Sequence, residues 1–197
     1  MPVTSTAARL GALALLVRPT YIATEVVTAA ATTGGYSFLA DSVSKLGEVG
    51  CAAAYCSPRH EVMNGSFIGY GALLAGGAAL SARTMGPVAT GLLVVSGLSS
   101  VATGLAPLDQ EATLHAIAAT PLFVAQPLAL LALGHRLKHR RPWLARALAA
   151  TGVVTAAAAI GFIVSGEDSA VSGGLERLAL WPVLFGVGAA AWANRDE

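Results

Sequence analysis

The first long apolar segment of the chain carries a row of polar residues. Arg18, Tyr21, Glu25, Thr28 and Thr32 are three or four residues apart, so a helix would place them along one face. An ionisable side chain inside a bilayer is costly unless it is paired, neutral or beside water, which makes it a candidate for function. Arg18 and Glu25 would lie about 10 Å apart along the helix axis, which is too far for a direct ion pair.

Glu25 therefore needs another partner or has to stay protonated. A buried neutral carboxyl group is a proton donor, whereas Arg18 can extend its long side chain towards the membrane surface. We predict that Glu25 is a catalytic acid or a titrating group. The alternative is that Glu25 only makes a hydrogen bond that joins its helix to a neighbouring one.

A second set of polar residues lies at the ends of two other apolar segments. Asp109 and His115 flank the start of the fourth segment, and Glu176 and Arg177 open the sixth. Together they could form a catalytic or substrate-binding site, or a satisfied network that joins the helices. No metal site is predicted, because two of the four histidines fall in a basic loop on the opposite side. No cofactor is predicted, because the chain has no phosphate-binding glycine loop and no haem motif.

The composition indicates where these residues must work. Of the 197 residues, 55% are hydrophobic and only 12% are charged, against about 25% charged in soluble domains. This excludes a nucleic-acid binder, a disordered tail and a standard soluble enzyme. Apolar segments of about 20 residues, the length that crosses a bilayer, predict an all-α polytopic membrane helix bundle that forms a single transmembrane domain over 1–197. The six expected spans cover 10–31, 63–82, 87–106, 114–133, 143–164 and 175–192.

The distribution of Lys and Arg predicts the orientation of these spans, because cytoplasmic ends carry an excess of both residues. One side collects eight of them, and these are Arg9, Arg83, Arg136, Lys138, Arg140, Arg141, Arg146 and Arg195. The other side collects Lys45, Arg59 and Arg177, together with most acidic residues, Glu167 and Asp168 among them. We therefore predict a multi-pass protein of the bacterial inner membrane with both termini cytoplasmic, and a basic 135–142 loop that contacts anionic lipid headgroups.

The longest connection, 32–62, is expected on the outer side. Residues 41–46 can form a short helix in which Asp41 and Lys45 pair. Cys51 and Cys56 face an oxidising compartment there, which predicts a disulfide bond; free thiols or half of a metal site are the alternatives.

Several short blocks of the sequence resemble the domain of unknown function 998 family, in particular its actinobacterial branch. The blocks cover residues 36–47, 56–60, 63–65, 107–115, 174–177 and 181–182, and Pro19, Tyr21 and Glu25 resemble the first span of that branch. The resemblance extends over nearly the whole chain. It implies a prokaryotic integral membrane protein of about six spans and no particular reaction.

In size, topology and possession of an intramembrane carboxyl group, the chain also resembles small bacterial membrane-bound terpene cyclases. This resemblance implies that Glu25 protonates a prenyl chain and that Asp109 or His115 accepts the final proton, beside aromatic walls that stabilise a cation. The residues expected to contact the substrate are Arg18, Tyr21, Tyr70, Glu176, Arg177 and Trp181.

The predicted function is a membrane-embedded enzyme acting on an isoprenoid or lipid-like substrate. Its expected partners are membrane lipids and a hydrophobic small molecule, such as a prenylated one, and no oligomeric state is predicted. The alternatives are a proton-coupled transporter and a non-catalytic membrane subunit or scaffold. A cavity that holds Glu25 between the first, second and fourth spans would favour the enzyme or the transporter, and a solid interior would favour the scaffold.

Overall fold

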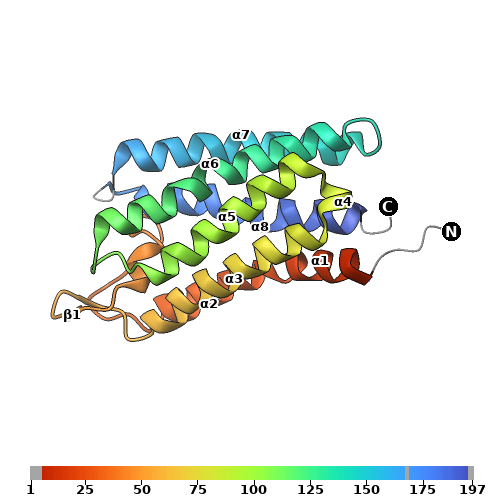
Figure 1. Ribbon diagram of the computed structural model, residues 1–197. Coiled ribbons are helices and arrows are strands. Elements are labelled where there is room, and N and C mark those ends of the chain that lie inside the picture. Colours follow the sequence, from red (N-terminus) through yellow and green to blue (C-terminus); the bar gives the residue numbers. More distant parts are fainter. Residues whose placement is uncertain (1–5, 167–168, 195–197) are drawn as a thin grey trace.

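The computed structural model is a bundle of long helices that run side by side along one axis (Figure 1). It describes residues 6–166 and 169–194. The helices are α1 (Thr6–Leu16), α2 (Tyr21–Ala29), α3 (His60–Leu80), α4 (Ala82–Met85), α5 (Pro87–Leu105), α6 (Ala112–Leu137), α7 (Pro142–Ser165) and α8 (Ser172–Asn194). The prediction of an all-α helix bundle is confirmed.

Five helical segments of the described chain are long and apolar enough to cross a membrane. They are Thr6–Ala29, Pro87–Leu105, Ala112–Leu137, Pro142–Ser165 and Ser172–Asn194, and they correspond to five of the six predicted spans. The remaining span, 63–82, corresponds to α3, which has 21 residues and contains several glycines together with Asn64 and Ser66, and which is not among these five segments. α3 packs along α5 (Figure 1), and the count of six spans stays a prediction.

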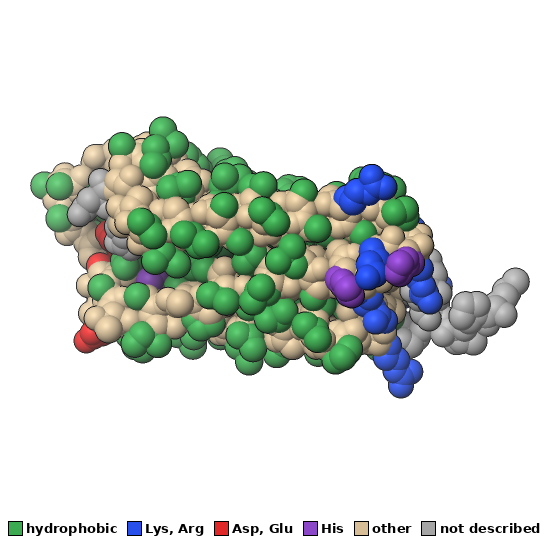
Figure 2. Space-filling model, turned by 90° about the horizontal axis from the view of Figure 1, so that it is seen from above, with side chains coloured by type: hydrophobic (Ala, Val, Ile, Leu, Met, Phe, Trp, Pro, Cys, Tyr) green, Lys and Arg blue, Asp and Glu red, His purple; other side chains and the backbone are tan. Residues whose placement is uncertain are grey.

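Charged side chains lie at the two ends of the bundle (Figure 2). Lys and Arg gather at the end that carries both chain termini, acidic side chains lie at the other end, and hydrophobic side chains cover the length between them. This arrangement agrees with the predicted orientation, which itself stays a prediction. Three of the charges used to predict the orientation, Glu167, Asp168 and Arg195, lie outside the described residues.

The first predicted span is divided by a single turn of 3-10 helix, η1 (Arg18–Thr20). Pro19 has no backbone N–H and its ring disfavours a regular helix, so α1 ends before it and α2 begins after it. The backbone N–H of Tyr21 donates to the carbonyl oxygens of Arg18 and Pro19. Arg18 and Glu25 are both buried inside the bundle, at 5% and 0% exposure, so Arg18 does not extend to the surface.

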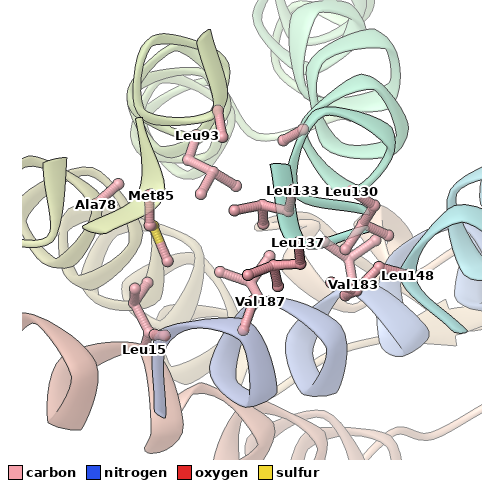
Figure 3. Close-up of a cluster of buried hydrophobic side chains, with 14 of the residues drawn as sticks. Leu15, Ala78, Met85, Leu93, Leu130, Leu133, Leu137, Leu148, Val183 and Val187 are labelled. Carbon is pink, nitrogen blue, oxygen red and sulfur yellow. The ribbon is translucent and has the colours of Figure 1, made fainter. Parts of the chain in front are cut away.

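Aliphatic side chains fill the half of the bundle next to the termini (Figure 3). Leu15, Met85, Leu93, Leu133 and Val187, from five different helices, point towards a common centre and are at most 1% exposed. Burial of such side chains stabilises a bundle through close packing, since lipid supplies no hydrophobic drive between helices. The polar residues singled out above lie in the other half.

The outer loop between α2 and α3 has little regular structure, but hydrogen bonds attach it to the helices. It contains the 3-10 turn η2 (Ser44–Gly47) and a two-stranded antiparallel ribbon of β1 (Cys51–Ala52) and β2 (Tyr55–Cys56). The predicted disulfide joins Cys51 and Cys56, whose Cα atoms are 4.4 Å apart. The predicted pair of Asp41 and Lys45 is confirmed at 2.6 Å, although the helical turn begins only at Ser44.

Glycines allow α3 and α5 to approach closely. A Cβ atom added to Gly97 would lie 2.5 Å from the carbonyl oxygen of Gly71, whereas one added to Gly91, on the same helix, would meet nothing within 4 Å. Small residues at a helix interface serve this purpose in membranes.

We therefore expect Gly97→Ala and Gly91→Ala to have opposite effects. Gly97→Ala forces α3 and α5 apart and should lower the free energy of unfolding by about 1–3 kcal/mol. Gly91→Ala should leave stability unchanged or raise it by up to about 1 kcal/mol, because alanine favours helix. Thermal unfolding of the purified variants in one detergent measures the difference, and equal Tm values would contradict the packing described.

Candidate functional site

Glu25 on α2 is paired with Arg177 on α8. The Nε atom of Arg177 lies 2.7 Å from Oε1 of Glu25, and the indole N–H of Trp181 donates to Oε2 at 3.0 Å. Both carboxyl oxygens are thus engaged, in a position that is completely buried. Glu25 therefore has a partner other than Arg18, which was one of the two possibilities drawn from the sequence. That partner, Arg177, was predicted to contact the substrate and not to pair with Glu25.

Arg177 also holds the outer loop against the bundle. Its Nη1 donates to the carbonyl oxygens of Phe38 at 2.7 Å, Asp41 at 2.9 Å and Gly173 at 2.9 Å, and its Nη2 donates to the hydroxyl of Tyr36. Its guanidinium group lies 4.7 Å from the centre of the Phe38 ring. The planar guanidinium can donate in several directions at once, so a single side chain joins α2, α8 and the loop.

Glu176, the preceding residue on α8, fixes the part of the loop that follows. Its Oε2 accepts the backbone N–H of Val43 at 2.5 Å. The carbonyl oxygens at the other end of this turn are held as well, that of Leu46 by the Ser57 hydroxyl and that of Gly47 by the Asn64 amide. These bonds determine the position of Ser44, the first residue of η2.

Ser44 lies in hydrogen-bond contact with His115 on α6. The Oγ atom of Ser44 is 2.9 Å from Nε2 of His115, and Nδ1 of His115 is 2.6 Å from the carbonyl oxygen of Ala106. A carbonyl oxygen only accepts, so Nδ1 carries a proton, and in the neutral imidazole Nε2 is then the acceptor for the Ser44 hydroxyl. A hydroxyl on a histidine that is itself oriented by a third group is the arrangement of an activated nucleophile.

Ser44 and His115 border a pocket of about 330 Å³ between α6 and α7. The apolar part of its lining includes Leu108, Phe123, Phe162 and Ile163, and Ile163 is 58% exposed on the side of the bundle. Glu176 completes the polar part beside Ser44 and His115. We call this space the lateral pocket; it has the size and the mixed lining of a small-molecule site.

A second space, the interior cavity, lies deeper among the helices and has a volume of about 50 Å³. Four of the predicted site residues line it: Arg18, Tyr21, Tyr70 and Glu176. Ser44, Ala119, Phe123 and Glu176 line both spaces, so the cavity and the pocket adjoin. Glu25 is not among the residues that line either one.

The structure does not bring Asp109, His115, Glu176 and Arg177 into one cluster, as the first catalytic interpretation required. Asp109 lies in the α5–α6 connection and accepts the backbone N–H groups of Val49 and Gly50, at 3.1 Å and 2.7 Å. It anchors the segment that leads into the disulfide ribbon. Arg177 faces Glu25, so only His115 and Glu176 share a pocket.

Sequence reasoning missed Ser44, Tyr36 and Gln126. Ser44 and Tyr36 fall within the block 36–47 that carries the family resemblance, but nothing in that block points to an imidazole. Gln126 is a polar residue next to Pro127 inside an apolar span, and this pattern could have singled it out from the sequence. Its side-chain amide donates to the Ser96 hydroxyl at 2.9 Å. It lines the interior cavity.

Removal of the Glu25–Arg177 pair is expected to be strongly destabilising and non-additive. Arg177→Gln leaves a buried carboxylate, two loop carbonyls and the carbonyl of Gly173 without their donor, which should cost about 3–5 kcal/mol. Glu25→Gln should cost less, about 1–3 kcal/mol, because the guanidinium keeps its carbonyl acceptors. The double variant should be destabilised by less than the sum of the two, because it no longer holds an unpaired buried carboxylate.

A double-mutant cycle from unfolding free energies measures this coupling. Lys45→Gln is the matched control, since its partly exposed pair should contribute about 0–1 kcal/mol. Additive effects of the two single substitutions would show that Glu25 and Arg177 do not depend on each other.

Asp109 should make a pH-dependent contribution to stability. Partial burial alone would raise the pKa of Asp109, but the N–H groups of Gly50 and Val49 outweigh it and hold this pKa below its usual value. The contribution is therefore present above about pH 3.9 and is lost as the pH falls through the lowered pKa. The Tm advantage of the wild type over Asp109→Asn should shrink between pH 6 and pH 3, and a constant difference would contradict this role.

The fold and the site together define a multi-pass membrane protein with a pocket at one end of its helix bundle. The sequence model of a family described as protein of unknown function (DUF998) matches residues 11–193. The chain therefore belongs to this family, as its sequence blocks indicated. No curated protein and no solved structure matches the chain.

Proposed function

We propose that the protein is a membrane-embedded enzyme that acts on an ester of a lipid-like molecule, with Ser44 as nucleophile and His115 as general base. The observation that carries this proposal is the 2.9 Å contact between the Ser44 hydroxyl and His115 Nε2 at the border of a pocket that opens on the side of the bundle. A nucleophile, a base and a group that orients the base are the parts that acyl transfer requires.

The reaction follows from this geometry. As the Ser44 oxygen forms a bond to the substrate's carbonyl carbon, its proton passes to Nε2 of His115. The ester C–O bond then breaks, and the same proton goes to the leaving alcohol oxygen. Water or a second alcohol releases the acyl group by the reverse sequence, which restores the Ser44 hydroxyl.

The walls of the lateral pocket support a lipid-like substrate. Phe123, Phe162 and Ile163 offer an apolar surface to a chain, whereas Ser44, His115 and Glu176 are gathered near the outer loop. An amphiphile in the outer leaflet would enter sideways, with its polar part towards Ser44 and its chain between α6 and α7.

Protonation of a prenyl chain by Glu25 has less support from the geometry. Both oxygens of Glu25 are engaged by Arg177 and Trp181, and a proton donor has to reach its substrate. Proton-coupled transport has less support too, because the aliphatic cluster around Leu133 and Val187 fills the bundle on the way to the other membrane side. Glu25 acts in this account as a structural residue.

An alkyl fluorophosphonate, which reacts with activated serines, tests the proposal directly. The purified protein should become labelled at Ser44, and His115→Gln should slow the labelling by about 10²–10⁴-fold, the usual contribution of a general base. Ser100→Ala is the matched control, because the Ser100 hydroxyl also lines the interior cavity but donates to the carbonyl oxygen of Phe67. This variant should be labelled at the wild-type rate.

Mass spectrometry of the digested protein identifies the labelled residue. No adduct on Ser44, or labelling that is equally fast in His115→Gln, would overturn the proposed function. Matching Tm values of the wild type and His115→Gln exclude unfolding as the cause of a slower reaction.

A further inference from the structure

The interior cavity contains two buried polar groups without a partner. Nη1 of Arg18 and the hydroxyl of Tyr21 make no hydrogen bond within the described chain, although both residues are buried, at 5% and 6% exposure, and both line the cavity. Most buried polar atoms in proteins are satisfied. Two unsatisfied polar atoms on residues that line one cavity are groups that a bound ligand would satisfy.

The charge of Arg18 indicates what kind of ligand this is. Its Nε donates to the carbonyl oxygen of Tyr70 at 3.4 Å, and no carboxylate of residues 6–166 and 169–194 forms an ion pair with it. Glu25, the acidic residue nearest in its own segment, is engaged by Arg177. A buried guanidinium without a counter-ion is stabilised by a carboxylate or a phosphate group, to which it can donate in two directions.

The two charges that line the cavity belong to different elements. Glu176, on α8, is bound to the outer loop through Val43, whereas Arg18 lies in η1, where α1 ends and α2 begins. An anionic group would be repelled by Glu176 and attracted by Arg18. It therefore belongs beside Arg18, and Ser44, which lines both spaces, adjoins the lateral pocket.

We infer that the interior cavity is an anion-binding subsite, in which Arg18 and Tyr21 hold the carboxylate or phosphate group of an amphiphile whose chain leaves through the lateral pocket. The inference deepens the proposed function, on which it rests for the position of the reacting bond. The substrate class is then an anionic lipid-like ester rather than a neutral isoprenoid.

Binding measurements on the full-length protein in phosphatidylcholine nanodiscs test the subsite without any turnover. The probes are dodecyl phosphate, dodecanol and inorganic phosphate, titrated calorimetrically with empty nanodiscs as reference. The wild type should bind dodecyl phosphate at least about 10-fold more tightly than dodecanol, because a charge-assisted hydrogen bond gives about 10–100-fold in affinity. Inorganic phosphate should bind much more weakly than dodecyl phosphate; equal affinity would show a site for a free anion and overturn the amphiphile.

Three variants locate the effect. Arg18→Gln should lose the preference for dodecyl phosphate by about 10–100-fold and leave dodecanol binding unchanged. Arg146→Gln is the matched control, because it removes one exposed arginine at the basic end of the bundle, and it should bind as the wild type does. Tyr21→Phe should weaken dodecyl phosphate binding without lowering Tm, since its hydroxyl has no partner among the described residues.

If Arg18→Gln does not fold, two other variants decide the question. Arg18→Lys, which keeps the charge, should retain most of the preference for dodecyl phosphate, and Tyr21→Phe should reduce it.

The outcomes separate this inference from the proposed function. Equal losses in Arg18→Gln and Arg146→Gln, or no preference for the anionic probe in the wild type, would overturn the subsite. Ser44→Ala should leave dodecyl phosphate binding unchanged. If Ser44 fails to react with a fluorophosphonate but the Arg18-dependent preference is present, the serine chemistry is wrong and the anion subsite stands.

Discussion

The contact between Arg177 and Glu25 determines the outer half of this molecule. It connects the first and last membrane-crossing segments, and the remaining donors of the same guanidinium bind the backbone of the outer loop. An ion pair inside a bundle is stable only if its other polar atoms are satisfied too. Here Trp181, Tyr36 and three carbonyl groups satisfy them. The loop is held firmly as a result, and with it Ser44, whose position next to His115 depends on the loop.

The bundle is divided into two halves with different tasks. The half near the termini is filled by aliphatic side chains such as Leu15, Leu93 and Val187 (Figure 3), and glycines bring α3 and α5 together. The other half is less completely packed and contains the interior cavity, the lateral pocket and a network of polar side chains. A site whose nucleophile and general base come from different elements needs both elements to be held in place. Here the closely packed half of the bundle and the hydrogen-bonded loop hold them.

Much of the fold could be predicted because the length and composition of each apolar segment indicate a helix without reference to the rest of the chain. The break in the first span was not predicted, although Pro19 is a residue that interrupts helices. The site depends on contacts between distant residues. Glu25 and Arg177 are 152 residues apart, and each was singled out for its type without any sign that they pair. Ser44 is one of many serines, and only the folded loop brings it to a histidine 71 residues away. Asp109 is of a residue type equally suited to catalysis, but the backbone N–H groups of Val49 and Gly50 bind its carboxylate.

The proposed reactive pair of Ser44 and His115, in a pocket that takes a lipid chain from the side of the bundle, can be observed in a crystal structure of the protein after reaction with a long-chain alkyl fluorophosphonate. We expect density continuous with the Ser44 Oγ atom and an alkyl chain that runs between α6 and α7 past Phe123 and Phe162. An adduct on another residue, or a chain that lies outside this pocket, would show that the proposed site is wrong.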